Sequence, residues 1–310
     1  MLKKKSFIYL TIIFLFLNNI SFSLENKILL KIENEIITSI DVNNEYKYLI
    51  ALNPNIKDSK KEDIKRLAQK SIVQEKIKKI EINKNFDNPK IPSKILEEIL
   101  KNVYTRIGIE NLEKFKEYLT IHNINFEDVQ NKLEIEALWN ELVIIKYSSR
   151  VKINEEKLKN KLQKNSNRSL KSYSLSEIAF EIKNVKELND KFIEISNTIN
   201  SKGFEFAVLE HSISSTTNFG GKLDWINENT LNKNIREALK NLKINQFTNP
   251  IAVPGGFLIL KIDDVKNLKI KINIDKELKK LVNYERNNQL NQYSKIYFNR
   301  IKKNLVINES

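Results

Sequence analysis

The sequence predicts an α+β fold, in which a mostly helical part surrounds a smaller part built on an antiparallel sheet. Three observations predict this fold. Apolar residues recur at helical spacing through roughly the first 160 residues. From about residue 172, short apolar runs and short helical patterns alternate in the order β-α-α-β-α-β-β, which is typical of a four-stranded antiparallel sheet with helices. A long helical pattern from Asp275 to about Asn304 then ends in a short strand, Leu305-Val306-Ile307.

The first 23 residues have the pattern of a secretory signal peptide. Lys3-Lys4-Lys5 gives a basic start, Phe7 to Leu17 is an apolar run, and Ser21 and Ser23 place small residues at a cleavage site before Leu24. Because the apolar run is shorter than the roughly 20 residues of a membrane-spanning helix, we predict cleavage and no stable membrane insertion afterwards. An uncleaved N-terminal anchor is the alternative.

A β-hairpin is predicted next. Ile28–Ile32 and Glu35–Thr38 flank Glu33-Asn34, and Asn34 is a residue type that tolerates positive φ in a turn. A lone strand at a chain end needs a partner, and this hairpin is the obvious partner for Leu305-Val306-Ile307. The small α+β part is therefore expected to be an insertion between two portions of one helical domain.

Six helices are predicted between the hairpin and the small α+β part. Thr38 or Ser39 caps the first of them, with Asp41 in its first turn. The predicted helices cover residues 41–52, 60–81, 92 to about 103, 112–122, 125–149 and 155–164. Their apolar stripes predict a core that includes Ile64, Leu67, Ile72, Ile95, Leu96, Ile99, Leu100, Val103, Val129, Leu133, Ile135, Leu138, Trp139, Leu142 and Ile145.

Four segments follow from this pattern. Residues 163–169 are polar and rich in turn formers, so they are predicted to link two domains. The predicted division is a signal peptide at 1–23, a helical domain at 24–166, a small α+β domain at 170–266, and a helix and strand at 267–310 that return to the helical domain.

Composition excludes several kinds of function. The chain has no cysteine, which rules out disulfides, thiolate metal sites and a thiol nucleophile, and its two histidines are too few for an ordinary zinc site. The net charge of +14 comes from a lysine-rich composition with scarce, unclustered arginine, so nucleic-acid binding is not predicted. Nucleotide-binding and hydrolase motifs are missing as well. The sequence therefore predicts no metal and no cofactor.

One segment carries a specific motif. Phe219-Gly220-Gly221-Lys222-Leu223-Asp224-Trp225 leads from a Gly-Gly turn into a short strand, and Gln246-Phe247-Thr248-Asn249-Pro250-Ile251 follows about twenty residues later. Pro254-Gly255-Gly256 then opens an apolar strand that begins with Phe257. In this order, residues 172–265 resemble the parvulin family of peptidyl-prolyl cis-trans isomerases.

The flanking sequence extends the resemblance. Ile32-Glu33-Asn34-Glu35-Ile36-Ile37-Thr38-Ser39-Ile40-Asp41 looks like the start of SurA-type periplasmic chaperones. Those proteins combine a helical N-terminal domain, one or two parvulin domains and a C-terminal helix that returns to the first domain. The resemblance implies a periplasmic protein that binds unfolded or extended polypeptides, outer-membrane β-barrel proteins in particular.

The resemblance also implies a site. Its polar ring falls on Glu177, where the family usually has histidine, and on Ser214 or Ser215, at its Cys, Asp or Ser position. The histidine usual on the last strand is Leu258 here, and His211 is expected to be structural. The substrate-binding residues that the resemblance implies are Leu223, Leu231, Ile235, Phe257 and Leu258.

These departures leave three readings open. The first is a periplasmic holdase chaperone whose client-binding surface is an apolar groove in the helical domain. The second is an efficient prolyl isomerase. The third is a non-catalytic structural or binding protein of the cell envelope that reuses the fold.

Overall fold

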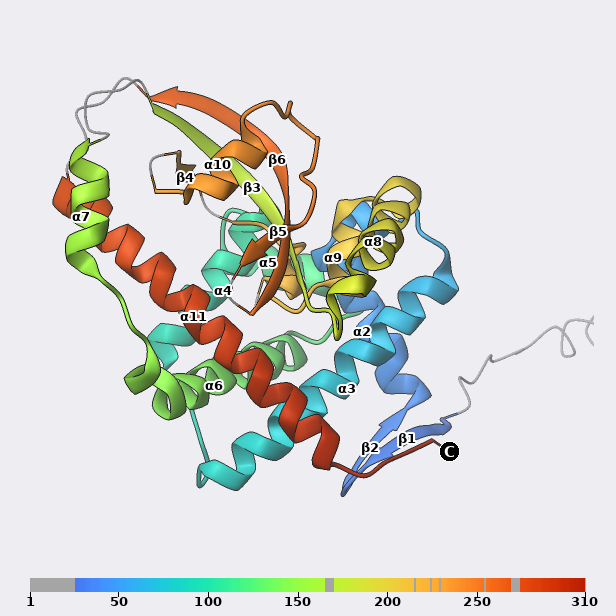
Figure 1. Ribbon diagram of the computed structural model, residues 1–310. Coiled ribbons are helices and arrows are strands. Elements are labelled where there is room, and N and C mark those ends of the chain that lie inside the picture. Colours follow the sequence, from blue (N-terminus) through green and yellow to red (C-terminus); the bar gives the residue numbers. More distant parts are fainter. Residues whose placement is uncertain are drawn as a thin grey trace, which may run out of the picture.

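The protein has an α+β fold with two separate antiparallel sheets. In the computed structural model, the larger sheet lies on one side of a helical assembly and the long helix α11 crosses past it (Figure 1). The structure describes residues 26–164, 170–214, 216–223, 225–228, 230–253, 255–268 and 274–309. The predicted signal peptide lies outside the described residues, as does most of the predicted linker.

The small sheet brings the hairpin and the C-terminal strand together. Strand β1 (Ile28–Ile32) pairs with β2 (Glu35–Thr38) on one side and with β7 (Ile307–Glu309) on the other, as predicted, although β7 begins two residues later than the predicted strand. The turn prediction was wrong, because Glu33 rather than Asn34 has positive φ, at 51°. Glu33 donates its backbone N–H to the carbonyl of Val306, and its carboxylate accepts the Val306 N–H, each at 3.3 Å. This contact is tertiary, so the turn preferences of Glu33 and Asn34 alone do not reveal it.

The helical part begins at a predicted cap. The Thr38 hydroxyl accepts the Asp41 N–H at 3.2 Å, and the Asp41 carboxylate accepts the Thr38 N–H at 2.8 Å, which makes a reciprocal capping box. The helices are α2 (Ser39–Leu52), α3 (Lys61–Asn85), α4 (Ser93–Arg106), α5 (Leu112–Ile121), α6 (Phe126–Tyr147) and α7 (Glu155–Lys164). Short 3₁₀ turns occupy Pro54–Ile56, Ser148–Arg150, Val185–Glu187 and Thr217–Phe219.

Most predicted core positions of these helices are buried and four are half-buried, but two are exposed. Ile95 and Ile145 are 47% and 59% exposed. Each residue turns an α-helix by about 100°, so Ile145 lies about 160° around α6 from buried Val143, and Ile95 lies about 140° around α4 from buried Leu100. Both isoleucines therefore belong to the solvent side of helices that pack on one side only.

The larger sheet has the strand order β4-β3-β6-β5, and every neighbouring pair is antiparallel. The predicted strand at Leu223–Ile226 is shorter than expected, although Leu223 still donates its N–H to the Leu175 carbonyl at 2.8 Å. The strands are β3 (Leu170–Phe180), β4 (Ile226–Asn227), β5 (Ile251–Val253) and β6 (Gly256–Leu268). The accompanying helices are α8 (Leu188–Lys202), α9 (Phe204–His211) and α10 (Lys233–Leu239).

Helix α9 belongs to two cores at once. Its residues Phe204 and Val208 pack into a cluster with the larger sheet, whereas Phe206 and Leu209 are buried in the cluster of the helical part. The sheet and the helical assembly therefore share one continuous apolar contact through this helix.

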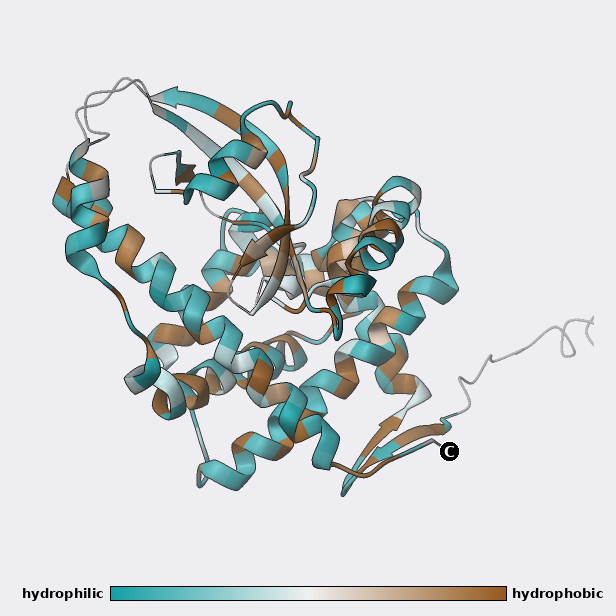
Figure 2. Ribbon diagram, in the orientation of Figure 1, coloured by the Kyte–Doolittle hydropathy of each residue, from teal (hydrophilic) through white to brown (hydrophobic). Residues whose placement is uncertain are grey.

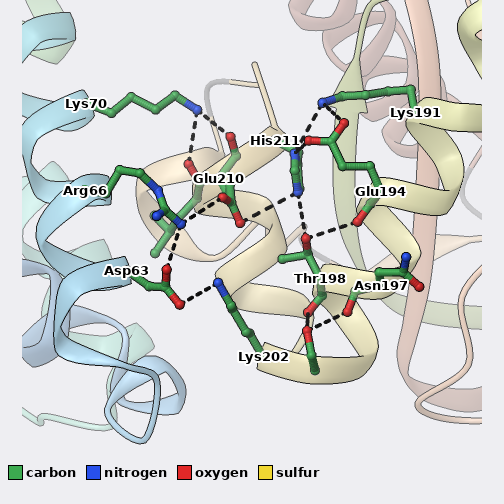
Figure 3. Close-up of polar contacts among 12 residues, drawn as sticks. Asp63, Arg66, Lys70, Lys191, Glu194, Asn197, Thr198, Lys202, Glu210 and His211 are labelled. Carbon is green, nitrogen blue, oxygen red and sulfur yellow. Dashed lines mark hydrogen bonds and ion pairs between the residues drawn. The ribbon is translucent and has the colours of Figure 1, made fainter.

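Charged residues reinforce the contact between α3 and helices α8 and α9 (Figure 3). Lys202 Nζ lies 2.5 Å from an Asp63 carboxylate oxygen, and Arg66 pairs with Glu210 at 3.4 Å. Lys70 donates to the backbone carbonyl of Glu210 at 2.5 Å, at the C-terminal end of α9 where the helix dipole favours a cation.

His211 is part of the same contact. Its ring is buried, with Nε2 3.0 Å from the Thr198 hydroxyl and Nδ1 3.4 Å from Lys191 Nζ. Burial, together with the positive charge of Lys191, lowers the pKa of His211 to about 4. The imidazole is therefore neutral at ordinary pH, and its surroundings are those of a structural residue.

Helix α11 (Ile274–Asn304) is anchored to the helical part. The Trp139 ring stacks on Tyr297 with 5.4 Å between ring centroids, and its indole N–H donates to Ser294 at 2.8 Å. Most of α11 is nevertheless hydrophilic (Figure 2). Among the described residues, no helix combines the length and the apolar character needed to cross a membrane.

Candidate functional site

A cavity of about 340 Å³ lies against the larger sheet. Asn232 accepts the Ile235 N–H at 2.8 Å and so caps α10, which fixes the start of that helix beside the cavity. The apolar lining comes from the loop before α10, from α10 itself and from strands β5 and β6: Leu231, Ile235, Val253, Phe257 and Leu258. This volume is within the range of small-ligand sites and suits one compact apolar group.

A hydrogen-bonded carboxyl group forms the polar wall of this cavity. Ser214 and Thr216 both donate their hydroxyls to the same oxygen of Glu177, Thr216 at 2.9 Å. Burial raises the pKa of Glu177, and the two hydroxyl donors only partly offset that effect. A carboxyl group with a raised pKa can serve as a hydrogen-bond donor in its protonated form.

Gly221 fixes the position of Glu177. Its φ is +73°, and its carbonyl accepts the Glu177 N–H at 2.8 Å. A Cβ atom on Gly221 would lie 2.3 Å from the Glu177 carbonyl oxygen, so the backbones approach too closely for any other residue. The Gly-Gly turn is therefore needed to hold Glu177 in its position at the cavity.

The structure brings most of the predicted site residues together. Glu177 and Ser214 line the 340 Å³ cavity, as do four of the five predicted substrate-binding residues: Leu231, Ile235, Phe257 and Leu258. Leu223 lines an adjacent cavity of about 410 Å³, which also contains Glu177. Ser215 lies outside the described residues. The catalytic and binding roles assigned to all of these residues remain predictions.

Sequence reasoning missed four residues at this site. Thr216, which directly follows Ser214 and Ser215, donates a second hydrogen bond to Glu177. Tyr284, Asn288 and Asn291 of α11 line both cavities. A run of amides at 287–292 is visible in the sequence, but only the tertiary fold places it opposite the sheet.

A second, larger cavity of about 690 Å³ lies among α2, α3 and α6. Its lining mixes apolar residues with many charged ones, so it differs from the apolar groove that the holdase reading expects. At its floor Lys132 lies 2.8 Å from the buried Glu45 carboxylate and also contacts Glu75. These carboxylates raise the pKa of Lys132 although burial alone would lower it.

The described residues contain no group of three or more histidine, aspartate or glutamate side chains that could hold a metal ion. The polar groups of the 340 Å³ cavity are the carboxyl groups of Glu177 and Glu285, the ammonium group of Lys295, and several hydroxyls and side-chain amides. Such groups can hydrogen-bond to a peptide.

Parts of the chain are similar to known proteins. Residues 178–264 match the family model of the rotamase PPIC-type PPIASE domain. The chaperone SurA of Pseudomonas putida is 21% identical over 184 residues, which cover 56% of this chain and 43% of that protein. The chaperone SurA of Buchnera aphidicola subsp. Schizaphis graminum is 30% identical over 129 residues, covering 38% of this chain and 30% of the relative. The matches thus span less than half the length of these relatives.

Solved structures give weaker likenesses. A SurA-like chaperone structure from Campylobacter jejuni covers 92% of this chain and 100% of its own, with 12% identity and a TM-score of 0.35. The peptidylprolyl isomerase PrsA of Bacillus anthracis covers 77% and 98%, with 18% identity and a TM-score of 0.30. These TM-scores are too low to define a shared overall arrangement. The chain therefore carries a PPIC-type parvulin domain at residues 178–264 and is similar in sequence to SurA chaperones over part of its length.

Proposed function

We propose that this protein is a periplasmic folding factor that binds unfolded polypeptides and isomerises their prolyl peptide bonds. The observation that supports this proposal is the 340 Å³ cavity, which is lined by the apolar side chains of Leu231, Ile235 and Phe257 and by the hydrogen-bonded pair of Glu177 and Ser214. The cavity lies within the segment that matches the rotamase family, apart from Glu177, which directly precedes that segment, and from the wall on α11.

Isomerisation needs no covalent chemistry. The barrier of about 18–20 kcal/mol comes from the partial double bond of the peptide C–N, which is lost when the amide twists. An apolar pocket that grips the proline ring removes water from the amide and so favours the less polar, twisted state. A hydrogen bond from the Glu177 carboxyl in its protonated form would stabilise that state further, and the hydroxyls of Ser214 and Thr216 hold this carboxyl in place.

The altered polar ring fits this chemistry because no proton transfer is required. Glu177 stands where the family usually has histidine, and it keeps a polar group with a raised pKa at the pocket wall. We infer that this group replaces the usual ring. The proposed clients are extended segments of outer-membrane β-barrel proteins, as the likeness to SurA chaperones suggests.

The test is a refolding reaction limited by prolyl isomerisation, whose slow phase takes about 10–100 s. The chain from residue 24 onward should accelerate this phase. Leu231→Ala should abolish the acceleration, whereas Leu239→Ala should retain it, because Leu239 is equally buried in the same cluster but does not line the cavity. Equal activity in both variants, with both folded, would refute the proposed site.

A holdase without isomerase activity is the second candidate. The 690 Å³ cavity of the helical part offers this candidate a site apart from the parvulin pocket and large enough to hold several side chains, but the many charged residues of its lining differ from the predicted apolar groove. Suppression of client aggregation that survives in Leu231→Ala, together with no effect of the unaltered chain on the slow refolding phase, would support this candidate.

A further inference from the structure

Helix α11 forms the wall of the parvulin pocket that faces the sheet. Tyr284, Asn288 and Gln292 recur every four residues, so they lie on one side of α11, and all three line the 340 Å³ cavity. Asn291 lines it as well. This helix begins ten residues beyond the segment 178–264 that matches the rotamase family, so the match accounts for only part of the pocket.

The same side of α11 continues into the adjacent cavity. That cavity of about 410 Å³ lies between α11, helix α6 and the start of the Gly-Gly turn. Four residues line both cavities: Glu177, Tyr284, Asn288 and Asn291. The two cavities are therefore neighbouring parts of one cleft between the larger sheet and α11.

The chemistry of this wall fits a polypeptide backbone. The side-chain amides of Asn288 and Asn291 carry both hydrogen-bond acceptors and donors, which match the C=O and N–H groups of a peptide, and Asn288 also hydrogen-bonds to Tyr284. Two charged side chains of α11, Glu285 and Lys295, line the 340 Å³ cavity as well, and Lys295 pairs with Glu181 at 3.1 Å. Amides outnumber charged groups on the α11 wall, so hydrogen bonding to a peptide backbone is its main chemistry.

The open volume of the cavity shows that α11 lines the parvulin pocket and does not fill it. If α11 filled the parvulin pocket, the apolar side chains there would pack against the helix and leave no cavity. Instead Leu231 and Phe257 face a cavity whose opposite wall is made by Asn288 and Gln292. Each of the two cavities reaches the size of a ligand site.

We propose that α11 is part of the substrate-binding site. An extended polypeptide lies between the sheet and α11, with its proline against Leu231, Ile235 and Phe257 and with its backbone bound by Asn288 and Asn291. This inference rests on the proposed function, because it assumes that a proline-containing polypeptide enters the parvulin pocket.

The test measures binding of a fluorescent six-residue peptide with a central proline to the chain from residue 24 onward. Asn288→Ala and Asn291→Ala should each weaken the affinity by about 2- to 12-fold, the loss of one hydrogen bond. Asn299→Ala is the matched control, since Asn299 is an exposed residue nearer the C-terminal end of the same helix and lines neither cavity. Thermal unfolding confirms that each variant is folded.

A second readout locates the peptide directly. Because the chain has no cysteine, the thiol of an Asn288→Cys variant is unique and can be labelled with a maleimide. Peptide should slow this labelling at least several-fold and should leave labelling of Asn299→Cys unchanged. The inference is overturned if the alanine variants bind the peptide as tightly as the unaltered chain does and the peptide does not protect the thiol. Tighter peptide binding by the alanine variants would overturn it as well, because α11 would then obstruct the site. If the unaltered chain neither binds nor isomerises the peptide, the proposed function fails and the inference fails with it.

Discussion

Replacing Phe206 with alanine tests whether the parvulin sheet and the helical assembly fold as one unit. Phe206 belongs to α9 in the segment that matches the rotamase family, yet its side chain is 0% exposed in the core cluster of the helical part. Lys202 Nζ also lies 4.7 Å from the centre of its ring. Truncating a buried phenylalanine costs about 3–5 kcal/mol, and the added cation–π contact favours the upper part of this range.

This loss should lower the melting temperature by about 6–20 °C, at roughly 2–4 °C per kcal/mol for a chain of this size class. The two tryptophans give separate probes, because Trp139 is buried in the helical part and Trp225 lies beside the larger sheet. Their fluorescence should report one shared transition in the unaltered chain and two separate transitions in Phe206→Ala.

Phe204→Ala is the matched control. Phe204 lies on the same helix and is nearly as buried, but it packs into the cluster of the larger sheet. It should destabilise the protein by a similar amount without separating the two fluorescence transitions. A fall of less than about 2 °C in Phe206→Ala, or a single shared transition in that variant, would refute the coupling argument.

Three further predictions concern buried charges. Burial raises the pKa of Glu177 in the folded state, so above the ordinary pKa of 4.5 the folded protein binds more protons than the unfolded chain, and the contribution of Glu177 to stability falls as pH rises. Glu177→Gln should therefore gain stability relative to the unaltered chain from pH 4 to pH 8. A difference in melting temperature that stays constant over this range would contradict the prediction. The pKa of His211 is lowered from 6.5 to about 4, so stability that is present above pH 6.5 is lost as pH falls towards 4; His211→Gln should avoid a loss of roughly 3 kcal/mol over this range, measured by urea unfolding. Lys132→Met should lower the free energy of unfolding by about 3–5 kcal/mol, because it leaves the buried Glu45 carboxylate without its cation. Lys116→Met, at an exposed ion pair, should barely shift the midpoint of urea unfolding. Equal midpoints for the two variants would contradict the prediction for the buried pair.

Local signals in the sequence predicted the local structure well. The capping box at Thr38 and Asp41 depends on two residues three positions apart, and the hairpin depends on a short turn between apolar strands, so both are visible without tertiary information. The return of β7 to β1 was also predicted, because a lone strand had only one evident partner.

Features set by tertiary contact were missed. Ile95 and Ile145 have the spacing of core residues, but their helices pack on one side only. The resemblance to the parvulin family pointed to Glu177 and Ser214, whereas Asn288 lies more than sixty residues after the Gly-Gly motif, outside the segment that carries the resemblance. No periodicity in the sequence indicates that α11 lies opposite this motif.

The most direct measurement is the cis–trans exchange rate of a proline-containing tetrapeptide, followed by NMR exchange with catalytic amounts of the chain from residue 24 onward. Several residue types should be tried before the proline. We predict accelerated exchange for at least one peptide, with acceleration lost in Leu231→Ala and kept in Leu239→Ala. Exchange at the uncatalysed rate for every peptide, with the protein folded, would contradict the account and leave the parvulin domain as a binding module.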